Sequence, residues 1–359
     1  MRRSTSRARL GTVAGAAVLA LLAGCASGAP EPRTPVDLGQ GEPGPAEDTQ
    51  ITLAIPFPDV TMHSMYAVGT ELGHYAEEGL SVEVITADNV AAAVSSGSAD
   101  VGVESAGSVI EAIRGGVEVD ALSGHFCRQN FDFATQPGVT AIDQLNGTNV
   151  VLAGTSGDPA EFQRALALRE AGWDLDSVDA EIVYPGPDSA TWREFFVTDR
   201  VSLIPFYGDD RPALEEYGAE IIVESLQNWP NDLQIAGSGW LAENPNSAVR
   251  FLRATMKAAE YIVAPGAGHI PANKDSVLDI YEKHGFDVAD LRVQNGPWVL
   301  DGHLTCPNLY FGEEAWNTTI ETQKLQPLDF AAHVDLAYLE RAQGLLGIGN
   351  DVPSELTYP

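Results

Sequence analysis

Residues 71–116 decide the fold: they read ELGHYAEEGLSVEVI at 71–85 and VAAAVSSGSADVGVESAGSVIEAIRGG at 90–116. The apolar pattern predicts strands at 82–85 and 101–103, and small apolar residues favour short helices at 90–96 and 109–114. Strands that alternate with helices indicate an α/β protein with a mainly parallel sheet. Ligands of such sheets bind at the carboxyl ends of the strands.

The same alternation continues on both sides of this stretch. Upstream, the sequence predicts a strand at 51–55 and one helix from 62 to 78, which Gly79 ends. A second α/β series is predicted downstream, with strands at 149–153, 182–184, 201–204 and 221–223 and a helix at 159–171. The chain then becomes helical, at 246–263, 276–284 and 330–343, and we expect these helices to pack on the first lobe.

The two quoted stretches, with FQRALALREAGWDLDSVDAEIVYPGP at 162–187, resemble the type II periplasmic-binding-protein family. The resemblance covers residues 51–265 and is to its nitrate-, sulfonate-, taurine- and thiamine-precursor-binding members. It implies two α/β lobes with central mainly parallel sheets, joined by crossing hinge strands. We expect lobe I at 51–138 and 236–350 and lobe II at 139–235. The implied function is that of the extracytoplasmic solute-binding component of an ABC importer, a monomer that closes around a small organic ligand and meets a permease and an ATPase.

The N-terminus has the pattern of an export signal. Arginines at positions 2, 3, 7 and 9 precede the apolar segment Leu10–Leu22, which is short for a membrane span. The following Leu-Ala-Gly-Cys25 resembles the lipobox of bacterial lipoproteins, which implies cleavage before Cys25 and acylation, palmitate included, of its thiol. Residues 1–25 are then the signal peptide, and residues 26–50, rich in Pro, Gly and acids, a flexible tether on the outer face of the cell membrane. The alternative is an ordinary secretory signal.

Charge and cysteine content narrow the function further. The formal net charge of −31 excludes a general affinity for nucleic acid or for anionic lipid headgroups. With Cys25 acylated, Cys127 and Cys306 are an even pair in an oxidising compartment, so we expect a disulfide between them. Two separate buried thiols are the alternative. No Cys or His spacing is typical of a metal site, so no metal is expected.

No catalytic motif accompanies the fold pattern. The sequence has no Gly-x-Ser-x-Gly elbow, phosphate loop, His-Glu-x-x-His or dinucleotide fingerprint, so we expect a binding protein without a cofactor and not an enzyme. One alternative is an enzyme on the same fold, similar to the eukaryotic pyrimidine-precursor synthases. Those enzymes use a histidine of their own and need a cysteine-rich motif that this sequence lacks. Another is a sensor lipoprotein that has lost its ligand.

The ligand is predicted from the residues at strand ends. Glu104 directly follows a buried strand, where the family resemblance implies a ligand contact, and a carboxylate there favours an amine or the edge of an aminopyrimidine. Arg128 is the one basic residue near the first-lobe strand ends, and Ser156 or Asp158 caps a helix whose free N–H groups could bind an anion. A nitrogen heterocycle such as a thiamine precursor is favoured, with sulfonate, taurine or nitrate as the alternative. The predicted ligand-binding set is Phe57, Asp59, Asn89, Glu104, Ser105, His125, Phe126, Arg128, Ser156, Gly157, Asp158, Pro185, Phe206, Tyr207, Trp229 and Asp232.

Overall fold

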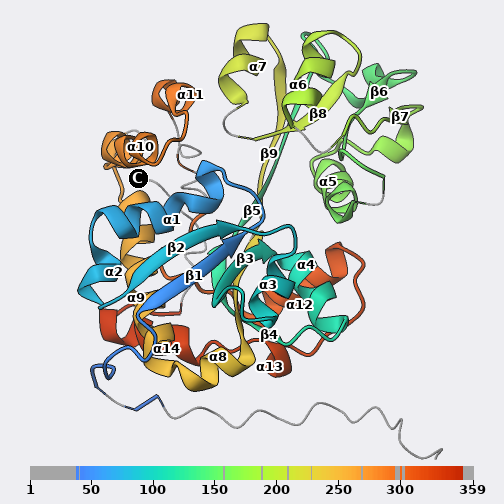
Figure 1. The fold of residues 1–359 in the computed structure, drawn as a ribbon. Helices are drawn as coiled ribbons and strands as arrows, with labels where there is room; N and C mark the ends of the chain where they lie inside the picture. The colour runs from blue at the N-terminus through green and yellow to red at the C-terminus, as the bar shows by residue number, and fades with distance from the viewer. Residues whose placement is uncertain are drawn as a thin grey trace, which may run out of the picture. The chain divides into compact units, whose positions relative to one another are not determined.

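The structure, a computed structural model, describes residues 38–39, 41–156, 158–186, 189–207, 210–227, 229–267, 270–295, 300 and 304–350. These residues form two five-stranded sheets (Figure 1). The first sheet has the strand order β2-β1-β3-β10-β4 and contains the strands predicted near 51, 82 and 101. Its strands are β1 (Gln50–Ile55), β2 (Ser81–Thr86), β3 (Val101–Ser105), β4 (Val119–Phe126) and β10 (Asp232–Gly237).

The second sheet has the strand order β7-β6-β8-β5-β9. Its strands are β5 (Gln129–Thr135), β6 (Asn149–Val150), β7 (Glu181–Ile182), β8 (Leu203–Phe206) and β9 (Glu220–Gln227). In each sheet one strand runs against the other four: β10 is antiparallel to β3 and β4, and β5 is antiparallel to β8 and β9. The mainly parallel α/β architecture predicted from the sequence is therefore confirmed.

Two crossing connections join the sheets. Strand β4 runs into β5 through residues 127–128, and β9 runs into β10 through the segment between Gln227 and Asp232. Strand β5 therefore belongs to the second lobe and β10 to the first. Pairing, which the local pattern does not reveal, assigns each crossing strand to its sheet. The lobe boundaries at 51–138, 139–235 and 236–350 stay a prediction.

Helices cover both faces of each sheet. The first lobe contains α1 (Val60–Glu71), α2 (His74–Glu77), α3 (Val90–Ser95), α4 (Ala106–Arg114), α8 (Ser238–Glu243), α9 (Pro245–Ile262), α10 (Lys274–Lys283), α11 (Ala289–Val293), α12 (Glu313–Thr322), α13 (Phe330–His333) and α14 (Ala337–Leu346). The second contains α5 (Pro159–Glu170), α6 (Ser189–Val197) and α7 (Arg211–Tyr217), with 3₁₀ turns at Ile142–Leu145 and Leu175–Ser177. As expected, C-terminal helices pack on the first lobe: α9 and α10 contact α1, α12 contacts α4, and α14 contacts α9.

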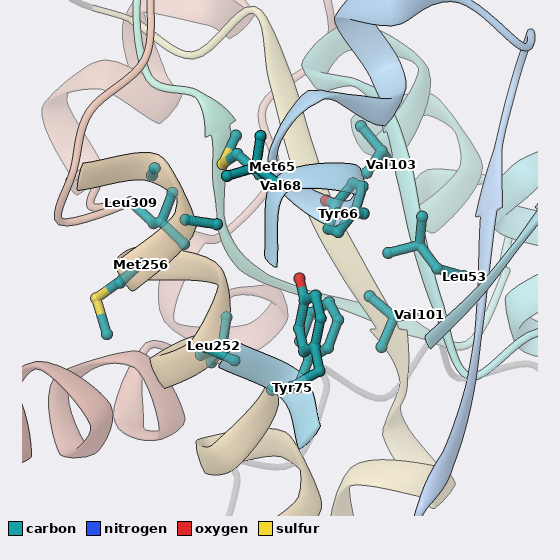
Figure 2. Close-up of a cluster of buried hydrophobic side chains, with 14 of the residues drawn as sticks. Leu53, Met65, Tyr66, Val68, Tyr75, Val101, Val103, Leu252, Met256 and Leu309 are labelled. Atoms are coloured by element: carbon teal, nitrogen blue, oxygen red, sulfur yellow. The ribbon is translucent and has the colours of Figure 1, made fainter. Parts of the chain in front are cut away.

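The core of the first lobe follows the two-residue period of its strands. Leu53, Val101 and Val103 point to the face covered by α1 and α9, where they meet Tyr66 and Leu252 (Figure 2). Ala54, the neighbour of Leu53, lies in a separate cluster with residues of α3, α4 and α12. Strands β4 and β10 are buried along their whole length, whereas β2 at the end of the strand order is partly exposed.

The helix predicted from 62 to 78 is two helices. Helix α1 ends at Glu71, and Gly73 takes a left-handed conformation with φ of 79° before α2 begins. A residue with a Cβ is strained there, whereas glycine is not. The break turns Tyr75 into the core, where its hydroxyl bonds to Thr255 Oγ1 at 2.9 Å and its ring stacks on Phe251.

The end of the predicted tether is docked on the first lobe. The Glu47 carboxylate accepts hydrogen bonds from the backbone N–H groups of Asn246 and Ser247 at 3.3 and 3.0 Å. Arg250 Nε donates to the carbonyl oxygen of Gly44 at 2.8 Å. Glu47 and Gly44, near the end of the predicted 26–50 tether, thus contact the first turns of α9, and composition cannot reveal such a long-range contact. The tether itself stays a prediction.

The predictions about the signal peptide and its acylated cysteine concern residues that the structure does not describe, whereas the predicted disulfide lies within the described residues. Cys25 and the signal peptide at 1–25 lie outside the described residues. The predicted disulfide is present between Cys127 and Cys306, whose Cα atoms are 5.7 Å apart. No helix in the described ranges is long and apolar enough to cross a membrane.

Candidate functional site

The predicted first-lobe residues meet at one edge of the first sheet. Strands β1, β2, β3 and β4 all end at this edge, and the antiparallel β10 begins there. Asp232, the first residue of β10, is paired with Ser105 on one side and with Phe126 on the other. The predicted residues that lie at these strand ends or directly after them are Phe57, Asp59, Asn89, Glu104, Ser105, His125, Phe126, Arg128 and Asp232.

The predicted second-lobe residues share an edge in the same way. Strands β6, β7, β8 and β9 end where β5 begins, and β5 begins directly after the two-residue crossing from β4. The residues at this edge are Ser156, Asp158, Pro185, Phe206, Tyr207 and Trp229. Gly157 lies outside the described residues. The crossing segments thus connect the two sheet edges that carry the predicted ligand-binding residues. Each of these edges is called below the residue-bearing edge of its sheet.

Several polar members of the set cap helices. Asp59 Oδ1 accepts the N–H of Met62 at 2.8 Å, and Asn89 Oδ1 accepts the N–H of Ala92 at 2.8 Å. Ser105 caps α4, and Asp158, not Ser156, caps α5. Each cap satisfies a backbone donor that the helix itself leaves open. One oxygen of each of these side chains is therefore already committed to the fold.

Glu104 differs from these residues. It is half-buried at the end of β3, and burial raises the pKa of its carboxyl group, which hydrogen bonds from the N–H groups of Ser105 and Val90 partly offset. The Ser105 N–H donates to Glu104 Oε1 at 3.2 Å. Within the described residues it has no ion pair with Lys, Arg or His. A half-buried carboxylate without a counter-ion attracts a cation or an N–H donor.

Four predicted residues lie deep in the first lobe. His125, Phe126, Arg128 and Asp232 are all buried. Both ring nitrogens of His125 have protein partners: Nδ1 lies 3.2 Å from the Tyr66 hydroxyl, and Nε2 3.3 Å from the carbonyl oxygen of Thr61. Since a carbonyl oxygen only accepts, Nε2 carries the proton and Nδ1 accepts from Tyr66. Desolvation lowers the pKa of His125 to about 4, so the ring is neutral near pH 7.

The aromatic residues of the set divide by exposure. Phe57 and Tyr207 are exposed, at 49% and 42%, whereas Phe126 and Phe206 are buried. Trp229 is half-buried and its Nε1–H donates to Gln129 Oε1 at 3.0 Å. Phe57 and Tyr207 therefore offer aromatic surface from the two lobes without any rearrangement, while the buried rings support the strand ends.

Arg164 on α5 is a residue that the sequence did not reveal. Its guanidinium group lies at the residue-bearing edge of the second sheet, where Nη1 donates to the carbonyl oxygen of Leu152 at 2.8 Å and Nη2 to the Tyr207 hydroxyl at 2.9 Å. Its Cζ is 5.3 Å from the centre of the Trp192 ring. In the sequence it is one of several polar residues along a helix, and only the fold shows that it reaches the ends of two strands.

No cluster of His, Cys, Asp and Glu with the geometry of a metal site occurs among the described residues. A family model described as "NMT1/THI5 like" matches residues 60–267, more than half of the 359-residue chain. The chain belongs to the NMT1/THI5-like family. Comparison of the sequence with curated proteins finds no match.

Solved structures share the fold of this NMT1/THI5-like protein. One is a putative sulfonate ABC transporter component, the periplasmic sulfonate-binding protein SsuA from Methylobacillus flagellatus, with 15% identity, a TM-score of 0.62, and coverage of 86% of this chain and 98% of that chain. Another is the periplasmic nitrate-binding protein NrtA from Synechocystis, with 14% identity, a TM-score of 0.60, and coverage of 87% and 93%. The predicted type II periplasmic-binding-protein fold is confirmed.

The fold of the NMT1/THI5-like chain is also shared with an enzyme. The desulfurization enzyme DSZB has a TM-score of 0.55 and 13% identity, with coverage of 83% of this chain and 100% of that chain. The fold alone therefore does not distinguish a binding protein from an enzyme. The residues of the site have to be used for that distinction.

Proposed function

We propose that this chain is the extracytoplasmic solute-binding component of an ABC importer and binds a small organic molecule between its two lobes. The observation that supports this most is the convergence of the predicted residues of both lobes on the two sheet edges that the crossing segments connect. Ligands of open α/β sheets bind outside the carboxyl ends of the strands. The solved relatives described as sulfonate- and nitrate-binding proteins share this fold.

The proposed mechanism is closure about the crossing segments. A ligand that contacts both edges favours the closed arrangement by its difference in affinity for the two states, and the closed lobes present a new surface to a permease, whose partner is an ATPase. The ligand-binding set proposed for this step is the one predicted from the sequence. We place Phe57, Glu104 and Tyr207 in first contact, because they are exposed or half-buried at the edges.

The favoured ligand is a nitrogen heterocycle such as a pyrimidine precursor of thiamine. Glu104 supports this choice, because a half-buried carboxylate accepts hydrogen bonds from an exocyclic amine and a ring N–H. Sulfonate, taurine and nitrate are the alternative. An enzyme on this fold is a further possibility, since the desulfurization enzyme DSZB shares it.

Isothermal titration of the purified mature chain with an aminopyrimidine, an alkanesulfonate, taurine and nitrate tests this function. We expect saturable binding of one class, with the ligand recovered unchanged after incubation, as mass spectrometry would show. Glu104→Gln should weaken binding of the aminopyrimidine about tenfold, since hydrogen bonds to a charged group contribute about 1.5–3 kcal/mol. Conversion of any bound compound would overturn the importer component and favour an enzyme.

We further propose that the protein is anchored through an acylated Cys25 to the outer face of the cell membrane. The sequence around Cys25 and the exported, oxidised state implied by the Cys127–Cys306 disulfide support this. In cells fed a radiolabelled or alkyne-tagged palmitate, the wild-type chain should carry the label. The Cys25→Ser variant should not, and label on that variant would refute the anchor.

A further inference from the structure

Each of the two sheet edges that carry the predicted ligand-binding residues holds one charged side chain that lacks an ion-pair partner among the described residues. The edge of the first sheet carries Glu104, which has no cationic partner in the described part of the chain. The edge of the second sheet carries Arg164, which is 7% exposed and has no carboxylate partner in the described part of the chain. Buried charges in proteins are as a rule paired, because the desolvation of a lone ion is costly. An acidic group on one lobe and a basic group on the other are thus both available to a ligand.

The geometry of Arg164 determines what Tyr207 can do. A guanidinium group has donors only, so in the 2.9 Å hydrogen bond from Nη2 the Tyr207 oxygen is the acceptor. The hydroxyl proton remains, and the described residues offer no other hydrogen bond to it. The side chain is 42% exposed, so this proton is available for an acceptor from outside. The adjacent positive charge polarises the hydroxyl and makes it a stronger donor.

A chain of contacts connects the two groups across the lobes. Ser105, next to Glu104, caps α4, and Gly107 in the first turn of α4 leaves room for the side chain of Gln323. Directly before Gln323, the hydroxyl of Thr322 accepts a hydrogen bond from Gln163 Nε2 at 3.1 Å. Gln163 precedes Arg164 on α5. Glu104 and Arg164 therefore flank the same place where the lobes meet.

We propose that the ligand is bipolar, with an amine or N–H donor end bound by Glu104 and an oxygen-rich, anionic end bound by Tyr207 under the charge of Arg164. This rests on the proposed function and narrows its ligand class. Aminopyrimidine phosphates and aminoalkyl sulfonates share this chemistry, whereas nitrate, simple alkanesulfonates and uncharged amines have one end each. Tyr207 is the specificity residue for the anionic end, and Arg164 acts through it as a positioning residue.

Isothermal titration with matched pairs distinguishes the two sources of this chemistry. The first pair is 4-amino-5-hydroxymethyl-2-methylpyrimidine and its monophosphate, and the second is ethanesulfonate and taurine. We expect one bipolar compound to bind at least tenfold more tightly than its one-ended partner. If a bipolar compound and its one-ended partner bind with equal affinity, the proposal of a bipolar ligand is overturned, while the proposed binding function stands. If no compound binds, both proposals fail.

Two conservative variants test which residue binds which end of the ligand. Tyr207→Phe removes only the hydroxyl and should weaken the bipolar compound about tenfold while leaving an amine-only compound unchanged; Glu104→Gln should weaken both. Tyr184→Phe is the matched control, since Tyr184 is similarly exposed and its hydroxyl donates to Glu161 at 3.2 Å. Unchanged melting temperatures would exclude misfolding. Equal losses in Tyr207→Phe and Tyr184→Phe, or no loss in Tyr207→Phe, would overturn the assignment.

Discussion

Cys127 and Cys306 form a disulfide that ties the crossing segment between the two sheets to the C-terminal part of the first lobe, 179 residues later. Cys127 is the first residue after β4, and Cys306 lies in a buried segment before α12. The β4–β5 crossing is therefore fixed to the first lobe at its start. Any bending between the lobes must occur beyond Cys127.

We expect the Cys127→Ser/Cys306→Ser double variant to lose about 2–5 kcal/mol of unfolding free energy, since a crosslink over so long a loop strongly restricts the unfolded chain. Urea unfolding monitored by tryptophan fluorescence measures the loss. Reductant should destabilise the wild type by a similar amount and leave the double variant unaffected. A reductant effect of equal size on both proteins would contradict the role of the disulfide.

Glu47 should stabilise the start of α9. The helix has no side-chain cap of its own at Asn244, and the Glu47 carboxylate takes over that role. We expect Glu47→Ala to lower the unfolding free energy by about 0.5–1 kcal/mol at pH 7. Glu260→Ala, which removes an exposed carboxylate from the same helix, is the control and should change it by less than about 0.5 kcal/mol.

The effect of Glu47 should also depend on pH. Burial raises the pKa of Glu47, but hydrogen bonds from Ser247 and Asn246 outweigh it and hold the pKa below the ordinary value of 4.5. A carboxyl group with a lowered folded-state pKa stabilises the fold above pH 4.5, and this contribution is lost as the pH falls through the lowered value. The difference between wild type and Glu47→Ala should shrink in acid; a constant difference would argue against an ionised cap.

Gly102 is required by the packing of α3 on β3. A Cβ at this position would overlap Val90 and would lie 2.9 Å from Cγ2 of Val94. We expect Gly102→Ala to cost about 1–3 kcal/mol of unfolding free energy, because the core cannot yield without moving the helix. Gly239→Ala in α8 is the matched control: nothing lies within 4 Å of its Cβ, so the change should be neutral or slightly stabilising. Equal effects of the two changes would refute the close packing.

The sequence predicted what depends on local pattern. The strands near 51, 82, 101 and 201 and a helix cap at Ser156 or Asp158 follow from short-range periodicity and capping preferences. The ends of the strands near 101 and 201 located Glu104 and Tyr207. Contacts between distant segments were not predictable in this way. Glu47 contacts α9 across about two hundred residues of sequence. Arg164 on α5 donates a hydrogen bond to Tyr207, which follows the end of β8. Neither pair has a local signal, because the side chains are placed by the assembled sheets.

His125 should make the stability of the first lobe depend on pH. Desolvation lowers its pKa from 6.5 to about 4, and its neutral ring accepts from Tyr66 while donating to the Thr61 carbonyl. Because the folded-state pKa is depressed, the stabilisation is complete above pH 6.5 and is lost progressively as the pH falls toward 4, where the unfolded chain binds a proton that the fold resists. The loss over this range is roughly 3 kcal/mol.

The His125→Gln variant isolates this contribution. We expect it to be less stable than the wild type at pH 7, because the buried Tyr66 hydroxyl loses a well-placed acceptor. The gap should narrow between pH 6.5 and 4, since the variant has no ring to protonate there. Urea unfolding of both proteins at pH 7, 5.5 and 4.5 measures it. Parallel stability curves would mean that His125 is not held neutral, and that the ring is open to solvent or to ligand.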